Sequence, residues 1–141
     1  MKSARLSSGS LALTATLLLA TAPAGPAQGS DFDGSRNLRC TPNHVADCNT
    51  AARCVRESLG DVDLPSFIRV QFDKKQLAGG GGNERTTAIQ NVQKLDGLTI
   101  LQGAENGRAW SMVIDQANGR MSGSIADEGG AFAIFGACLA E

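Results

Sequence analysis

The sequence predicts a mainly β protein, either an antiparallel meander closed into a small up-and-down barrel or a sheet held by disulfide staples. Three observations predict it. Turn residues recur at short intervals from Leu64 to the C-terminus, the segments between them alternate apolar and polar residues, and the body of the chain contains four cysteines. The chain of 141 residues is 42% hydrophobic, which suffices for one core.

Residues 1–27 have the three-part layout of a secretory signal peptide. Lys2 and Arg5 give a positive head, an uncharged apolar run follows, and small residues with prolines end the segment. The apolar run is shorter than the roughly 20 residues that a membrane-spanning helix needs. We therefore expect cleavage near Ala24 or Ala27, export to the periplasm or out of a bacterial cell, and no stable membrane anchor afterwards.

The mature chain is expected to begin with a flexible N-terminus, residues 28–36, and to continue as a single β-rich domain, residues 37–141. Two of the 13 basic residues lie in the leader, so 11 basic and 14 acidic residues remain. Such a mildly acidic surface gives no electrostatic reason to expect nucleic acid as a partner. The expected partner is an envelope protein, a glycan or a small molecule.

The N-terminal part of the domain allows two interpretations. In the first, Asn37–Thr41 and Ala52–Glu57 are strands that precede Ser66–Phe72, where every second residue is apolar. In the second, His44–Leu59 is a short amphipathic helix stapled to a six-stranded sheet.

Glycines mark the expected loops and turns in the rest of the chain. The run Gly79–Gly82 predicts a mobile connection, because glycine loses the most backbone entropy on folding. The later Asp-Gly and Asn-Gly pairs tolerate the positive φ of two-residue hairpin turns. The strands expected around these turns are Thr86–Gln93, Leu98–Gly103, Arg108–Asp115, Arg120–Ala126 and Ala131–Cys138. The core residues expected on them are Trp110, Met112, Ile114, Met121, Ile125, Phe132 and Ile134.

The cysteines of the mature chain are Cys40, Cys48, Cys54 and Cys138. An even number in a short exported chain predicts two disulfides, and three connectivities are open. We favour Cys40–Cys138, which would tie the ends of the domain, together with Cys48–Cys54 as a local staple. The alternative is a zinc site that adds His44 to three of the thiolates. An oxidising compartment and the helix-breaking Pro42 argue against it, so we expect no metal and no cofactor.

Two sequence stretches carry a resemblance. They read G-x-E-N-G-x-x-W-S-x-x-I-D from Gly103 to Asp115 and F-x-x-F-G-x-C from Phe132 to Cys138. The chain resembles a family of small exported bacterial proteins of unknown function, and this resemblance implies no activity. In size, compartment and cysteine placement the chain is also similar to the periplasmic inhibitors of C-type lysozyme, without a functional residue that transfers.

A catalytic set is not recognisable in the sequence. Ser111, His44 and Asp115 are present, but Ser111 lies outside any nucleophile elbow. We therefore expect no enzyme but a non-catalytic binding or inhibitor-like module. The candidates for contact with a partner lie at one expected hairpin: Glu105, Asn106, Arg108 and Trp110. The alternative is a small-ligand carrier with an apolar cavity inside the barrel.

Overall fold

The structure is a computed structural model that describes residues 30–82 and 84–141. The expected signal peptide, residues 1–27, lies outside the described residues. The described strands are β1 (Leu38–Asn49), β2 (Cys54–Glu57), β3 (Phe67–Gln71), β4 (Gln76–Gly80), β5 (Thr86–Ala88), β6 (Asn91–Leu95), β7 (Leu98–Glu105), β8 (Arg108–Asp115), β9 (Arg120–Asp127) and β10 (Gly130–Ala140).

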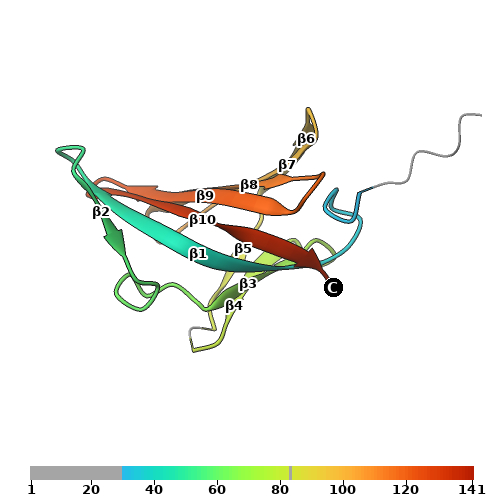
Figure 1. Ribbon diagram of the computed structural model, residues 1–141, viewed down its shortest axis with the longest axis horizontal. Helices are drawn as coiled ribbons and strands as arrows, with labels where there is room; N and C mark the ends of the chain where they lie inside the picture. Colours follow the sequence, from blue (N-terminus) through green and yellow to red (C-terminus); the bar gives the residue numbers. More distant parts are fainter. Residues whose placement is uncertain (1–29, 83) are drawn as a thin grey trace, which may run out of the picture.

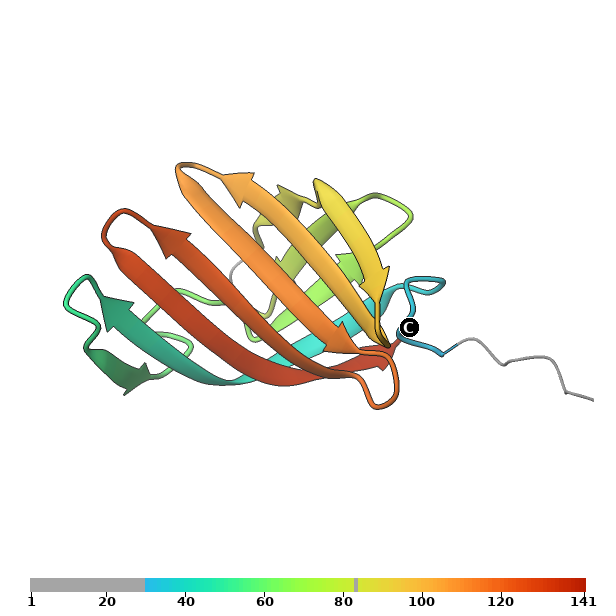
Figure 2. The same ribbon diagram turned by 90° about the horizontal axis from the view of Figure 1, so that it is seen from above.

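These strands form one antiparallel sheet in the order β5-β4-β3-β1-β10-β9-β8-β7-β6, with β2 also paired to β1. The sheet curls into a half-barrel (Figure 1). In Figure 2, β6 to β10 lie side by side in one layer and β3 to β5, in green, lie behind them. The mainly β prediction is confirmed, since the described part of the chain contains no helix.

The N-terminal part of the domain, for which the sequence allowed strands or a helix, forms the two strands β1 and β2. β1 runs for 12 residues, and β2 folds back on it through a turn in which the Asn49 side chain accepts hydrogen bonds from the N–H groups of Ala51 and Arg53. The helix over His44–Leu59 is therefore wrong. Residues 44–49 are held extended because they pair on one side with β10 and, from Val45 to Cys48, on the other with β2.

The first and last strands pair with each other. Cys40 and Cys138 are direct cross-strand partners between β1 and β10, and a disulfide joins them. Cys48 and Cys54 are the corresponding partners between β1 and β2, also joined by a disulfide. Both predicted disulfides are confirmed, and the barrel wall is continuous from β3 through β1 to β10.

The wall is incomplete where β5 and β6 meet. The expected strand Thr86–Gln93 is divided, because its first part pairs with β4 and its second part with β7. At the bend the Ile89 N–H donates to the Lys75 carbonyl (2.8 Å) and the Gln90 N–H donates to the Gln102 carbonyl (2.9 Å). The chain thus crosses between the two outer edges of the sheet at one place, and among the described residues no ladder pairs β5 with β6 or β7.

β4 is a strand that the sequence reading missed. Gly79 and Gly80 end it, so the prediction of a mobile connection is wrong for these two residues. The Phe67 ring lies where a Cβ on Gly80 would be, and the Arg39 guanidinium carbon lies 3.8 Å from the centre of the same ring. Glycine is therefore used here to let an aromatic ring lie against the backbone of the next strand.

The core lies on the concave face of the sheet. Of the predicted core residues, Met112, Ile114, Met121 and Ile134 are buried. Trp110, Ile125 and Phe132 are half-buried and pack against them.

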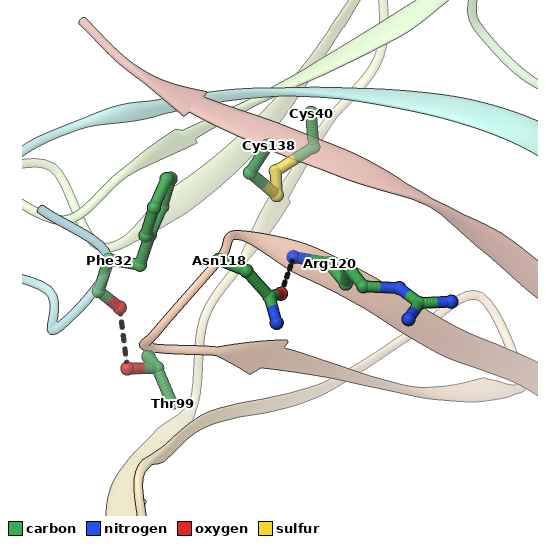
Figure 3. The surroundings of a disulfide bond; sticks show 6 residues. All are labelled: Phe32, Cys40, Thr99, Asn118, Arg120 and Cys138. Atoms are coloured by element: carbon green, nitrogen blue, oxygen red, sulfur yellow. Dashed lines mark hydrogen bonds between the residues drawn. A yellow bond between two sulfur atoms is a disulfide. The ribbon is translucent and has the colours of Figure 1, made fainter.

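Residues 30–36 cover one end of the half-barrel, which we call the closed end. The Phe32 carbonyl accepts a hydrogen bond from the Thr99 hydroxyl (2.8 Å), and the Phe32 ring packs against the core near the Cys40–Cys138 disulfide (Figure 3). The expected flexible N-terminus, residues 28–36, stays a prediction; in the structure its described part contacts the core through Phe32.

One carboxyl group within the closed end has a shifted pKa. Hydrogen bonds from the hydroxyl and backbone N–H of Ser35 lower the pKa of Asp33 below its ordinary value of 3.8. This interaction stabilises the folded segment above that ordinary pKa and is lost as the pH falls through the lowered one.

Candidate functional site

A cavity of about 450 Å³ lies on the concave side of the sheet, between the layer of β8 to β10 and the layer of β3 to β5. Its volume falls in the range of roughly 300–1,000 Å³ that is usual for small-molecule sites. The apolar residues lining it are Leu64, Pro65, Ile68, Leu77, Trp110, Met112, Met121, Ile125 and Ile134. The exposed charged residues lining it are Asp63, Arg85, Glu105 and Arg108.

The wall of the cavity is apolar and adaptable. Met112 and Met121 contribute unbranched, polarizable side chains that conform to ligands of different shapes. The Trp110 indole N–H donates to the Thr87 hydroxyl oxygen (3.3 Å), which ties β8 to β5 across the incomplete part of the wall. The Ser111 and Ser124 hydroxyls, on adjacent strands, form a hydrogen bond with each other (3.0 Å).

The charged groups stand at the open end of the cavity, which we call the mouth. The guanidinium of Arg85 forms an ion pair with Asp63, linking the segment before β3 to the segment before β5. Nε of Arg108 lies 3.2 Å from Oδ2 of Asp127, at the end of β9. Because these side chains are exposed, their ion pairs are weak and exchangeable.

The hairpin turn at the mouth is fixed by backbone geometry. Asn106 has φ 50° and Gly107 has φ 78°, the left-handed conformation that a two-residue turn between antiparallel strands requires. Glu105 ends β7 and Arg108 begins β8, directly opposite each other in the ladder. The turn therefore holds three polar side chains at the edge of the cavity.

The structure brings the four candidate residues together at this site. Glu105, Asn106 and Arg108 are exposed at the mouth, and Trp110 is half-buried in the wall. The sequence reading missed the facing wall, which comes from Asp63–Pro65, from Ile68, from Leu77 and from Arg85–Thr87. No local pattern indicates that wall, because it faces the hairpin only after β3 and β4 pair at the far side of β1. Contact of these residues with a partner stays a prediction.

The zinc site, the alternative to the favoured disulfides, is wrong, because all four cysteine sulfurs are used in the two disulfides. Among residues 30–82 and 84–141, no cluster of three or more histidine, cysteine, aspartate or glutamate side chains has an arrangement suited to a metal ion. His44 lies away from the cavity lining, with its Nδ1 2.6 Å from Nη2 of Arg56.

The disulfides indicate folding in an oxidising environment, extracellular or periplasmic. Within the described residues, no helix has the length and apolar character required to cross a bilayer. Comparisons with protein-family models, with curated proteins and with solved structures found no match for this chain.

Proposed function

We propose that this chain is an exported, non-catalytic binding protein that holds a small, largely apolar ligand in the cavity of the half-barrel. The observation that carries the proposal is the cavity itself, about 450 Å³ in volume, with an apolar wall and charged residues at its mouth. Ligand sites commonly combine these features, because burial of apolar surface supplies affinity and a few polar groups orient the ligand.

The energetics of filling the cavity support the proposal. At about 30 Å³ for each water in the liquid, the cavity has room for about 15 waters. Waters against the methionine, isoleucine and leucine side chains of the wall find few hydrogen-bond partners there. An apolar ligand that replaces them gains about 25 cal/mol for each Å² of apolar surface removed from water.

Export is supported by two features that agree. Residues 1–27 have the pattern of a cleavable leader, and the folded body contains two disulfides. N-terminal sequencing of protein recovered outside the cytosol tests this part of the proposal. A mature chain that begins near Gly25 or Gln28 is expected, and an uncleaved cytosolic chain would contradict it.

Fluorescence of Trp110 tests ligand binding directly, because it is the single tryptophan of the chain and lines the cavity. Titration with the neutral apolar probe N-phenyl-1-naphthylamine is expected to give saturable probe fluorescence and energy transfer from Trp110. Ile125→Phe, which places a larger side chain in the cavity, is expected to weaken binding about 10-fold or more.

The matched control is Val113→Phe. Val113 lies next to Met112 on β8 and so faces the other side of the sheet. Its substitution is expected to leave the dissociation constant unchanged. Non-saturable probe fluorescence, or equal effects of the two variants, would contradict the proposal.

The inhibitor-like alternative is favoured by one observation, the exposure of all four residues of the hairpin tip from Glu105 to Arg108. An exposed, rigid turn is a common element of inhibitors that enter an enzyme cleft. Undiminished lysis by a C-type lysozyme in the presence of excess purified protein would reject this second candidate.

A further inference from the structure

We infer that the cavity selects apolar ligands that carry a cationic group, such as an alkylammonium, and that Glu105 recognises this group at the mouth. The inference rests on the proposed function and names the ligand class of the same site. It follows from the charges at the mouth and from how each of them is already paired.

The two arginines at the mouth have carboxylate partners. Arg85 is paired with Asp63, and Arg108 is paired with Asp127. Each guanidinium therefore has part of its charge balanced before a ligand arrives. A ligand carboxylate has to draw one of them away from its aspartate or share it, so that less interaction energy is gained.

Glu105 differs from these four residues. Within the described part of the chain its carboxylate makes no hydrogen bond or ion pair, although it lines the cavity and is exposed. It stands at the end of β7 next to Asn106, whose side-chain amide oxygen is a further acceptor at the mouth. A carboxylate and an amide oxygen together suit a group with several N–H donors.

Trp110 adds a second feature that favours a cation. Its ring is half-buried in the cavity wall, on the strand that starts at the same hairpin turn as Glu105. The face of a tryptophan ring attracts cations through its quadrupole. The Glu105 carboxylate and the face of the Trp110 ring therefore both attract a cation, while the deeper lining offers apolar surface to an alkyl chain.

Three probes with the same ten-carbon chain test the inference: decylammonium, decanol and decanoate. Each is titrated at pH 7 and low ionic strength, below its aggregation concentration, with Trp110 emission and displacement of N-phenyl-1-naphthylamine as readouts. Decylammonium is expected to bind about 5-fold more tightly than decanol, as one ion pair worth about 1 kcal/mol predicts. Decanoate is expected to bind more weakly than decanol.

Two variants separate the role of Glu105 from a general charge effect. Glu105→Gln is expected to reduce the affinity for decylammonium to that for decanol and to leave decanol binding unchanged. Asp96→Asn removes the same charge in the turn before β7, at the other end of that strand from Glu105. It is expected to leave the order of the three probes as in the unaltered chain.

The outcomes distinguish this inference from the proposed function. If none of the three probes binds, the proposed function is wrong and the inference with it. If decanol binds, but decylammonium binds no better or Glu105→Gln changes nothing, the cavity still holds apolar ligands and the inference about the cationic group is overturned.

Discussion

Two glycines leave the space in which the Trp110 and Phe67 rings lie. Gly103 is the cross-strand partner of Trp110, and Gly80 is the cross-strand partner of Phe67. At both positions, a Cβ would overlap the partner's ring. The absence of a side chain on one strand therefore lets the ring on the next strand lie flat across it, which is how Trp110 reaches the cavity wall.

The substitution Gly103→Ala tests this role. The new Cβ would lie 2.6 Å from the Ala88 carbonyl oxygen and would overlap the Trp110 ring, so either the ring or β5 has to move. We expect a loss of about 1–3 kcal/mol in the free energy of unfolding, measured with urea, and a changed Trp110 emission maximum.

Gly60→Ala is the control for that prediction. At Gly60 the nearest atom to a new Cβ is the Ser58 hydroxyl oxygen at 3.9 Å, which is an ordinary contact. The free energy of unfolding is expected to stay constant or to rise by up to about 1 kcal/mol, since alanine restricts the unfolded chain. Equal losses for the two variants would show that crowding around the Trp110 ring is not the cause.

At the scale of strand pairs, a disulfide joins β1 to β10 and a second disulfide joins β1 to β2. The Cys40–Cys138 disulfide joins the first and last strands over a sequence separation of 98, and the Cys48–Cys54 disulfide closes a hairpin with a separation of 6. A longer loop has more chain entropy to lose when it is closed. The first disulfide is therefore expected to stabilise the fold more than the second.

Paired substitutions measure this difference. Chain entropy predicts a loss of about 4–5 kcal/mol for Cys40→Ser with Cys138→Ser and roughly 2 kcal/mol for Cys48→Ser with Cys54→Ser. Urea unfolding of each double variant, compared with the unaltered chain, gives both values. A larger loss from the second pair would mean that the hairpin of β1 and β2 matters more to the fold than the pairing of β1 with β10.

At the scale of the whole molecule, the half-barrel has one closed end and one mouth. The Phe32 segment covers the end where β7 begins, and the Glu105–Arg108 hairpin stands where β7 finishes. A ligand that enters the cavity at the mouth passes the charged residues that line it. This arrangement lets the mouth select among ligands that fit the apolar wall equally well.

The substitution Phe32→Ala tests the closed end. Phe32 packs against the core, so removal of its ring is expected to lower the free energy of unfolding by about 2 kcal/mol. Phe135→Ala is the matched control, since Phe135 is 49% exposed and is expected to contribute less than about 1 kcal/mol. Similar losses in urea unfolding would show that residues 30–36 add nothing specific to the fold.

Local sequence patterns were sufficient to predict most strands in the C-terminal half of the chain. β8 has the expected bounds, and β7, β9 and β10 differ from the expected strands by one or two residues at an end. The reason is that Asn-Gly and Asp-Gly turns, together with period-two alternation, are encoded within a few neighbouring residues. The cysteine count also predicted two disulfides and left three connectivities open, of which the structure has the favoured one.

Only the tertiary structure decided the conformation of the N-terminal strands, the order of the β4 glycines and the presence of the cavity. Whether residues 44–49 form a helix or a strand depended on the pairing of β1 with β10 and β2, and the glycines of β4 became ordered because the Phe67 ring covers Gly80. The cavity is the clearest case. One of its walls, the Glu105–Trp110 hairpin, is local in sequence, whereas the other comes from segments between Asp63 and Thr87 that face it only when the sheet curls. A sequence specifies which residues favour a turn or a strand, but the space enclosed between distant strands exists only in the folded chain.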